Sequence, residues 1–372
     1  MRILLVIDHL GTGGAQRQLV NLGSGLQHLG HQVEFFVYYP TRDLAEQLES
    51  LCIPIWQVAK TRRFSPRVPF ALRNRLRVGG YDVALSYLDT PNFYLELASL
   101  GVGRTKIVVS QRAQYAPGRL TLHRQVLENF HRLADHLVVN SRSQMQRMVR
   151  EFPWLAGRIS TISNGVGPQF FVAKKDAESR PKLRLLAVST IVPLKNVEAL
   201  VEALGICQQQ AGLSVDVWWV GRVGSSDYFS QLQYRLELLD LTDNWSWLGQ
   251  RNDVAALMAQ CDGLVHPSHS EGFPNAICEG LAASLPVLAG RIGDHEFLVE
   301  RCAAGYLFDP ARPDELAAAL IRFANLPQDE RAAMGERARS FAQQELSMDL
   351  CTRRYEDLFV HLTGGVTSTC AV

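Results

Sequence analysis

Short apolar segments alternate with helical patterns along the first half of the chain. Residues 3–7 are wholly apolar, which is typical of a strand buried on both faces of a parallel sheet. Leucines then recur at helical spacing from Leu19 to Leu29, and Gly30 can end that helix. Further strand candidates are residues 33–38, 83–86, 106–110 and 136–140. This alternation predicts a doubly wound parallel sheet.

The same rhythm begins again after residue 181. Strand candidates separated by helical stretches are residues 183–188, 215–220, 264–266 and 286–288. Between the halves, residues 171–182 are polar and mixed in charge, as in a linker. The pattern predicts an α/β protein with two Rossmann-like domains, residues 1–175 and 176–344. We expect a C-terminal helix at about 345–362 to pack back on the first domain.

The composition narrows the class of protein. With 372 residues, 47% of them hydrophobic and 20% charged, the chain can fill two sizeable cores. No apolar run approaches the roughly 18 residues of a membrane-spanning helix. The seven cysteines are scattered and form no C-x-x-C pair. This spacing argues against a disulfide framework or a zinc site and favours a reducing, cytoplasmic compartment.

The net charge of +1 hides an asymmetry between the halves. Residues 1–180 hold 23 Lys and Arg against 13 Asp and Glu, whereas the remainder holds 15 against 24. Opposite signs suggest that the two domains meet different partners, and that the first domain meets something anionic.

The glycine turn at residues 11–14 follows the first strand, where a doubly wound sheet binds anions. The backbone of Gly13 and Gly14 can approach a ligand closely, and the following helix directs free N–H groups to the same point. A turn without a ligand is the alternative. A dinucleotide fingerprint would need a glycine where Gln16 stands, although Glu34 is placed to bind a ribose. An NAD-dependent oxidoreductase is therefore a further hypothesis.

Residues 267–290 hold the most informative pattern. Glu271 follows a strand candidate, and Pro274 suits the first turn of the helix that comes next. The amides at the start of that helix would form an anion site. Glu279 lies further along the helix, and two carboxylates eight residues apart suit the binding of sugar hydroxyls. An acidic loop with a surface glutamate is the simpler alternative.

This stretch resembles the E-x7-E signature of glycosyltransferase family 4, whose members are retaining enzymes of GT-B fold. The likeness rests on Pro267-Ser268, residues 271–275 and Glu279. Other segments match the family in order along the chain: residues 13–15, 30–33, 139–141, 163–166, 195–196, 247–249 and 305–308. The resemblance implies two Rossmann-like domains that face each other across a cleft.

The resemblance also implies roles for individual residues. Glu271 would contact the donor sugar near its anomeric carbon, Glu279 would bind the ribose hydroxyls, and Lys195 would neutralise the diphosphate. The backbone that would close around phosphates and sugar belongs to Gly13, Gly14, Gly272, Phe273, Pro274, Asn275 and Ala276. No metal or other cofactor is expected, because Lys195 and helix amides can do the work of Mg²⁺.

The chain departs from the family pattern at the second diphosphate-binding cation. The family usually has an arginine five residues before the lysine, and Thr190 stands there in this chain. Arg222 follows Gly221 in a segment where the family often has G-x-G, and it could reach the donor site instead. A solvated loop arginine is the alternative.

The first half offers candidates for acceptor and membrane contacts. Gln111 and Arg112 resemble the S-E-R variant of enzymes that extend lipid-linked oligosaccharides, where Arg112 would bind an acceptor phosphate or hydroxyl. Residues 60–77 hold seven basic residues and no acidic one, with apolar residues interspersed. This segment indicates contact with an anionic membrane surface, a solvated basic face being the alternative. No nucleic-acid recognition motif accompanies it.

We therefore expect a retaining transferase that takes a sugar from a nucleotide diphosphate, UDP in preference to GDP-mannose. Its acceptor would be a glycan or a polyprenyl-linked oligosaccharide in cell-surface polysaccharide synthesis, at the inner face of the plasma membrane. The missing arginine at Thr190 keeps a second hypothesis open, a non-catalytic nucleotide-sugar-binding scaffold.

Overall fold

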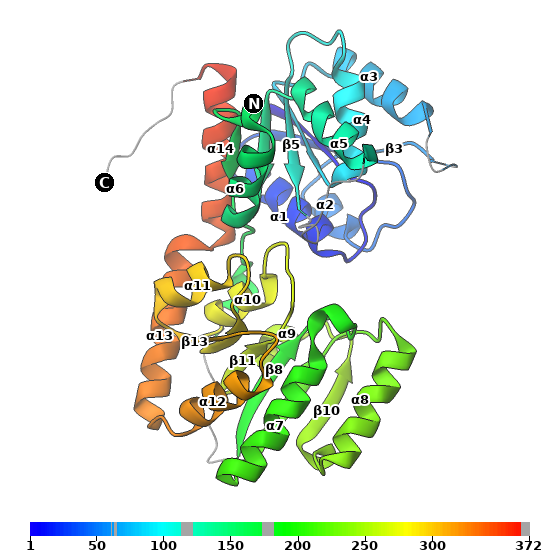
Figure 1. The fold of residues 1–372 in the computed structure, drawn as a ribbon. Helices are drawn as coiled ribbons and strands as arrows, with labels where there is room; N and C mark the ends of the chain where they lie inside the picture. Colours follow the sequence, from blue (N-terminus) through cyan, green and yellow to red (C-terminus); the bar gives the residue numbers. More distant parts are fainter. Residues whose placement is uncertain (61, 63–64, 113–121, 173–181, 366–372) are drawn as a thin grey trace. The chain divides into compact units, whose positions relative to one another are not determined.

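The computed structural model describes residues 1–60, 62, 65–112, 122–172 and 182–365, which form two compact units (Figure 1). Unit 1 is Met1–Gly165 together with the C-terminal segment that begins at Met348, and unit 2 is Val166–Ser347. Each unit is built on its own parallel sheet with helices on both faces. The predicted fold class, an α/β protein with two Rossmann-like sheets, is confirmed.

Unit 1 contains a seven-stranded sheet in the order β3-β2-β1-β4-β5-β6-β7. Its strands are β1 (Arg2–Val6), β2 (Gln32–Val37), β3 (Ile55–Gln57), β4 (Val83–Tyr87), β5 (Lys106–Gln111), β6 (His136–Val139) and β7 (Ile159–Thr161). Its helices are α1 (Gly14–His28), α2 (Ala45–Ser50), α3 (Arg67–Gly79), α4 (Asp89–Ser99), α5 (Leu122–Phe130), α6 (Arg142–Glu151) and α14 (Met348–Thr363), with short 3-10 turns η1 (His131–Leu133) and η2 (Pro153–Leu155). The strand order reverses between β1 and β4.

Unit 2 contains a six-stranded sheet in the order β10-β9-β8-β11-β12-β13. Its strands are β8 (Leu183–Val188), β9 (Val215–Val220), β10 (Trp245–Gly249), β11 (Gly263–His266), β12 (Val287–Gly290) and β13 (Gly305–Phe308). Its helices are α7 (Val197–Ala211), α8 (Ser226–Leu238), α9 (Val254–Met258), α10 (Asn275–Ala282), α11 (His295–Cys302), α12 (Pro313–Ala324) and α13 (Gln328–Glu345), with 3-10 turns η3 (Pro168–Phe170), η4 (Pro193–Lys195) and η5 (Thr242–Asn244). Here the strand order reverses between β8 and β11.

Both sheets are buried on both faces. In β1, Ile3 and Leu5 lie in the core shared with α1 and α14, whereas Leu4 and Val6 lie in the core on the side of α3 and α4. A strand covered on both sides must be apolar at every position, which is why residues 3–7 form one uninterrupted hydrophobic run. The same rule explains the buried, apolar Leu185-Leu186-Ala187 segment of β8.

The strands that the sequence did not reveal are the four edges of the two sheets, β3, β7, β10 and β13. Each interior strand corresponds to a predicted apolar run. The edge strands are short, and most of their residues are partly or fully exposed. An edge strand pairs on one side only and needs no continuous apolar run, so hydrophobic patterning detects it poorly.

The chain enters unit 2 earlier than the boundary predicted at residue 175. Val166 and Phe170 are buried in the core that packs around α10 and α13, and Val166 N–H donates to the carbonyl of Leu346 (2.7 Å). Residues 173–181 of the predicted linker lie outside the described residues.

Helix α14 packs against α1 in unit 1. Tyr355 and Phe359 are fully buried in the core below α1, and the hydroxyl of Tyr87 at the end of β4 donates to that of Tyr355 (3.0 Å). Near the start of α14, Gln18 of α1 clamps the backbone of Gly165, accepting from its N–H (3.0 Å) and donating to its carbonyl (2.8 Å).

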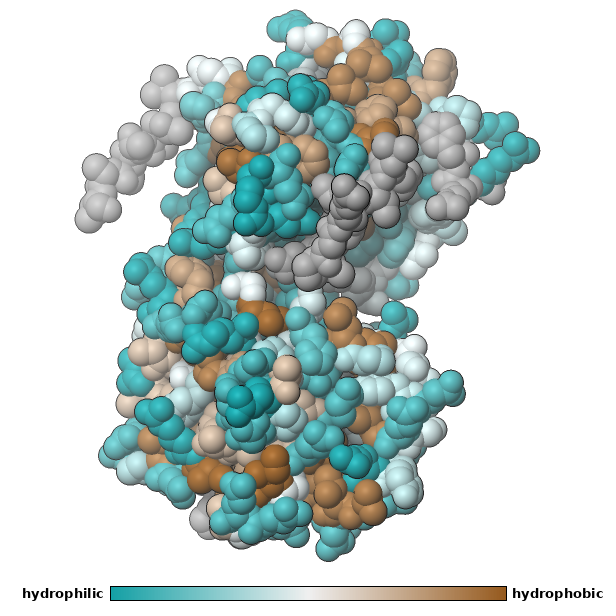
Figure 2. Space-filling view, in the orientation of Figure 1, coloured by the Kyte–Doolittle hydropathy of each residue, from teal (hydrophilic) through white to brown (hydrophobic). Residues whose placement is uncertain are grey.

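Two strongly exposed apolar side chains lie on α3. Phe70 is 76% exposed and Val78 is 69% exposed, and the exposed Arg67 and Arg77 lie on the same helix. Figure 2 shows hydrophobic side chains gathered over the part of unit 1 that holds α3 and α4. Helix α3 belongs to the basic segment 60–77, of which residues 61, 63 and 64 lie outside the described residues. Within the described ranges, no helix is both long and apolar enough to cross a membrane.

Replacing Gly165 should loosen the attachment of α14. A Cβ atom on Gly165 would lie 2.7 Å from the Cα of Met348 and 3.0 Å from the Cβ of Cys351, and backbone there cannot yield easily. We expect Gly165→Ala to lower the free energy of unfolding by about 1–3 kcal/mol, measured by urea denaturation. Gly103→Ala is the control, because nothing lies within 4 Å of a Cβ at that position. Equal stability of the two variants would contradict this packing.

Candidate active site

The carboxyl ends of β8 and β11 flank the point where the strand order of unit 2 reverses. In open α/β sheets, ligands bind in the crevice that such a reversal creates. Lys195 ends η4, which follows β8, and Glu271 lies in the loop between β11 and α10. The fold therefore brings together two residues that are far apart in sequence and that the sequence assigned to the donor site.

Glu271 is held by three side chains. The ammonium group of Lys195 forms an ion pair with it, the Nε2 atom of His266 lies 2.8 Å from Oε1, and the hydroxyl of Ser268 donates to Oε1 (2.8 Å). The side chain of Glu271 is 14% exposed. A buried carboxylate without partners would be costly, and these contacts compensate its charge.

The ionisation states at this site follow from its contacts. Burial alone would raise the pKa of Glu271, but the contacts with His266 and Lys195 outweigh burial and lower its pKa to about 2. Glu271 is therefore a carboxylate at neutral pH. Burial, helped by the nearby His266, lowers the pKa of His295 to about 4. His295 is thus a neutral imidazole whose Nδ1–H donates to the carbonyl of Gly290 (2.8 Å).

The backbone after Lys195 fixes the position of η4. Asn196 has a left-handed conformation with φ 54°, which asparagine tolerates better than most residues. Its amide donates to the carbonyls of Pro267 (3.0 Å) and Pro310 (2.7 Å). The first of these contacts ties η4 to the loop that carries Glu271. The left-handed conformation gives a physical reason for an asparagine directly after the lysine in this chain.

Helix α10 begins at Asn275, directly after the Glu271 loop. Phe273 and Ala276 are buried, whereas Gly272, Asn275 and Glu279 are partly exposed. The free N–H groups of the first turn of α10 start at this loop, as the sequence predicted. Pro274 is buried and stands just before the first helical residue.

Thr190 and Arg222 lie in two loops that are tied together. Ile191 N–H donates to the carbonyl of Arg222 (2.9 Å), and Ile191 pairs with Val223. The Arg222 side chain is exposed and forms no hydrogen bond or ion pair with the described part of the chain. At Gly221 a Cβ atom would overlap the carbonyl oxygen of Ser189, so the close approach of the two loops requires glycine there.

In unit 1, the strand order reverses between β1 and β4, so the corresponding switch point lies at the carboxyl ends of these strands. Gly13 caps α1, and both Gly13 and Gly14 are exposed. Leu88, directly after β4, has φ 77° and ψ 155°, a region that is essentially restricted to glycine. Such strain concentrates at functional sites. No pattern in the sequence indicates it at this leucine.

The two acceptor candidates are held inside unit 1. The Gln111 side-chain amide is buried and donates to both carboxylate oxygens of Glu128 (2.8 and 2.7 Å). The Arg112 guanidinium stacks on the ring of Tyr87 (3.7 Å) and donates to Asn164 (2.5 Å) and to Tyr355. Direct contact of either residue with an acceptor stays a prediction.

Sequence reasoning missed His266 and His295 in unit 2 and a buried cluster in unit 1. His266 ends β11 and packs edge-to-face against His295, with ring centroids 5.4 Å apart. Its place at the carboxyl end of a strand, just before Pro267, was an available signal. In unit 1, His131 contacts Glu96 (2.6 Å) and Glu128 (3.4 Å). Burial opposes protonation of His131, but the two carboxylates raise its pKa to about 10, so it is a buried cation.

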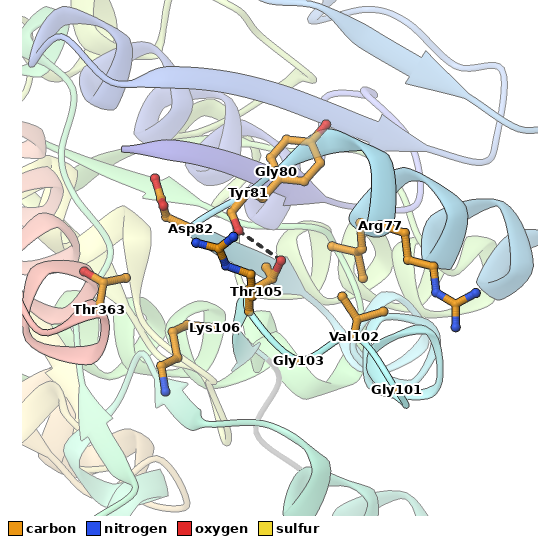
Figure 3. A pocket seen from close by; sticks show the side chains of 12 residues that line it. Arg77, Gly80, Tyr81, Asp82, Gly101, Val102, Gly103, Thr105, Lys106 and Thr363 are labelled. Atoms are coloured by element: carbon orange, nitrogen blue, oxygen red, sulfur yellow. Dashed lines mark hydrogen bonds between the residues drawn. The ribbon is translucent and has the colours of Figure 1, made fainter.

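A cavity of about 540 Å³ lies elsewhere, at the amino-terminal ends of β4 and β5 in unit 1. Figure 3 shows Asp82, Thr105 and Lys106 around it, with Arg77 at the end of α3. Ligands of doubly wound sheets bind at the opposite, carboxyl ends of the strands, so this cavity is not the candidate active site. Among the described residues, no group of three His, Cys, Asp or Glu is arranged to hold a metal ion.

Two Rossmann-like units, with an ionised glutamate and a lysine at the switch point of the second, are the framework of a GT-B glycosyltransferase. A family model described as Glycosyltransferase Family 4 matches residues 12–170, and one described as Glycosyl transferases group 1 matches residues 170–341. The chain belongs to the glycosyltransferase family that these two models describe.

Individual relatives agree with this assignment. Lipopolysaccharide glucosyltransferase WaaG of Escherichia coli is 21% identical over 350 residues, 90% of this chain and 91% of that protein. A glycosyltransferase of Methanocaldococcus jannaschii is 28% identical over 213 residues, and this match spans only 55% of either chain. The solved structure of HepE from Anabaena in complex with UDP has a TM-score of 0.84 at 21% identity, covering 97% of this chain and 100% of HepE. The structural likeness shows the GT-B fold.

Glu271→Gln should change the response of unit 2 to acid. The folded-state pKa of about 2 lies below the ordinary value of 4.5, so the carboxylate contributes stability above pH 4.5 that is lost as the pH falls towards 2. Over this window, the free energy of unfolding should fall more steeply in the wild type than in Glu271→Gln. Tryptophan fluorescence in urea is a suitable probe, because Trp218, Trp219, Trp245 and Trp247 lie in unit 2. Parallel stability profiles of the wild type and Glu271→Gln would contradict the ion pair. Glu336→Gln, at an exposed position of α13, is the control.

Proposed function

We propose that the protein is a retaining glycosyltransferase that uses a nucleotide diphosphate sugar, UDP-linked in preference to GDP-mannose. The observation that carries this proposal is the ionised Glu271 paired with Lys195 at the switch point of unit 2. A lysine beside helix amides suits a diphosphate, and a carboxylate suits sugar hydroxyls. The relative HepE has been solved with UDP and with UDP-glucose, which supports the choice of nucleotide.

In this proposal unit 2 binds the donor. Lys195 and the first amides of α10 neutralise the diphosphate, whose negative charge grows as the bond to the sugar breaks. Glu279 of α10 binds the ribose hydroxyls, and Glu271 binds hydroxyls of the sugar. The leaving group departs and the acceptor attacks on the same face, so the anomeric configuration is kept. Lys195 and the helix amides supply the positive charge, so the proposed reaction requires no metal.

Arg222 is the proposed second cation for the diphosphate. Its side chain is exposed and unpaired within the described chain, and its backbone is bonded to Ile191, beside Thr190. It can therefore supply the charge that the family arginine would supply at Thr190. The alternative function, a nucleotide-sugar-binding scaffold without turnover, follows if neither Arg222 nor Lys195 completes the site.

We assign the acceptor to unit 1, where the strained Leu88 lies directly after the carboxyl end of β4. Gly13 and Gly14, at the start of α1, remain proposed contacts of the donor's phosphates and sugar. The acceptor class is a glycan or a polyprenyl-linked oligosaccharide of cell-surface polysaccharide synthesis. The name of WaaG, a lipopolysaccharide glucosyltransferase, supports this class. Arg112, which stacks on Tyr87 and donates to Asn164, is the proposed contact for an acceptor phosphate or hydroxyl, with Gln111 next to it.

We further propose that α3 contacts the inner face of the plasma membrane. Phe70 and Val78 expose apolar surface next to arginines, a combination that suits the interface of an anionic bilayer. The excess of basic residues in residues 1–180 adds long-range attraction to such a surface.

The donor assignment is tested by separating nucleotide affinity from turnover. Glu279→Ala should weaken the binding of free UDP by about one to two orders of magnitude, since it loses a charged hydrogen-bond partner. Glu271→Ala should not weaken the binding of free UDP but should abolish turnover, and Arg222→Ala should lower kcat more than UDP affinity. Calorimetry with UDP and steady-state kinetics on a nucleotide-sugar panel measure these effects.

Glu336→Ala is the matched control for these variants, at an exposed position of the same unit. Tight UDP binding by the wild type without turnover on a broad acceptor panel would support the scaffold instead. Unchanged UDP affinity in Glu279→Ala would show that the nucleotide lies elsewhere.

The membrane assignment is tested by vesicle sedimentation. Phe70→Asp should reduce binding to phosphatidylglycerol vesicles at least tenfold, because it removes an apolar contact and adds a repelled charge. Leu238→Asp is the matched control, since Leu238 is 61% exposed on α8 of unit 2. Equal binding of the two variants, or no binding by the wild type, would overturn the assignment.

A further inference from the structure

The hydrogen bonds to Glu271 are distributed unequally between its two carboxylate oxygens. Lys195, His266 and Ser268 all reach Oε1. Oε2 accepts no hydrogen bond from any described residue. One oxygen is therefore saturated by the protein, and the other keeps its full capacity to accept bonds from a ligand.

The three donors differ in how firmly they are held. His266 and Ser268 are 4% and 1% exposed, and both are fixed at the end of β11. The ring of His266 packs at a 69° angle on His295, which is bonded to the last residue of β12. Lys195 has a flexible stem, and its side chain is 19% exposed. Only the contacts of His266 and Ser268 come from residues that are held rigidly at the carboxyl end of β11.

The proposed function makes opposing demands on Lys195. A diphosphate carries more negative charge than a single carboxylate, so it would compete with Glu271 for the ammonium group. Once Lys195 turns to the phosphates, Glu271 needs another donor to stay ionised and in place. His266 and Ser268 can fill that need, because neither has to move when the donor substrate binds.

We propose that His266 is the positioning residue of Glu271: its Nε2–H, with the Ser268 hydroxyl, holds Oε1 so that Oε2 alone faces the donor sugar, independently of Lys195. This inference rests on the proposed function. The donor must be the ring nitrogen, because an ionised carboxylate only accepts hydrogen bonds. The direction of the Glu271 pKa agrees, since His266 contributes the largest of the contacts that lower it.

The test compares His266→Leu with His266→Gln, because glutamine can place an N–H close to the position of Nε2. His266→Leu should lower kcat by roughly 10- to 100-fold, as expected for a misplaced reacting group, while free-UDP affinity stays unchanged. His266→Gln should recover most of this loss. The exposed His269, three residues further on, gives the control variant His269→Gln.

A pH profile separates positioning from simple packing. The charged or titratable groups that face Glu271 are Lys195, His266 and, behind His266, His295. Without His266, burial dominates and the pKa of Glu271 rises, so the acid limb of kcat/KM should move to higher pH by about one unit or more. His266→Gln should move it less. Titration of the Glu271 carboxyl carbon by NMR gives the same comparison without turnover.

The outcomes are distinct. The inference alone would be overturned if His266→Leu turned over substrate at the wild-type rate, with the acid limb of kcat/KM and the titration of the Glu271 carboxyl both unshifted. Absence of wild-type turnover with every nucleotide sugar would overturn the proposed function, and the carboxyl titration would still decide the inference. Should His266→Leu not fold, His266→Asn, whose side chain ends short of Oε1, takes its place in both measurements.

Discussion

The organisation of unit 2 depends on an ionised carboxylate that is mostly removed from water. Glu271 keeps its charge because Lys195 and His266 reach it from two neighbouring strands, β8 and β11. Lys195 is distant from Glu271 in sequence and meets it only because β8 and β11 end at the same edge of the sheet, whereas His266 ends the strand that leads into the Glu271 loop. Removing a partner would leave a buried charge uncompensated, which is far more costly than the pair itself is stabilising. The sheet topology and the site are therefore mutually dependent.

The sequence predicted the interior strands, which are covered on both faces and paired on both sides, but it did not predict the partly exposed edge strands. Every interior strand contains a mostly apolar run, so hydrophobic patterning located all of them. The edge strands β3, β7, β10 and β13 lack this pattern and were missed. The boundary between the units was placed too late. Val166 and Phe170, which precede the predicted linker, are already buried in the core of unit 2. Two isolated side chains make no periodic pattern.

The candidate site was predicted where residue types follow the family signature. Glu271 and Lys195 were named from sequence, and the structure brings them into contact. His266 and His295 were not named, because contact between the ends of different strands leaves no trace in local spacing. The sequence also did not indicate that the Gln111 amide donates to Glu128 inside unit 1. Burial of a polar side chain depends on tertiary packing, which the sequence does not display.

The central claim is that the Glu271–Lys195 pair marks the donor site, and a crystal structure with UDP tests it most directly. We expect the diphosphate within hydrogen-bond distance of the Lys195 ammonium group, the ribose hydroxyls on Glu279, and the His266–Glu271 hydrogen bond still in place. UDP bound away from Lys195, or bound with Lys195 still on Glu271 and no phosphate contact, would contradict the account.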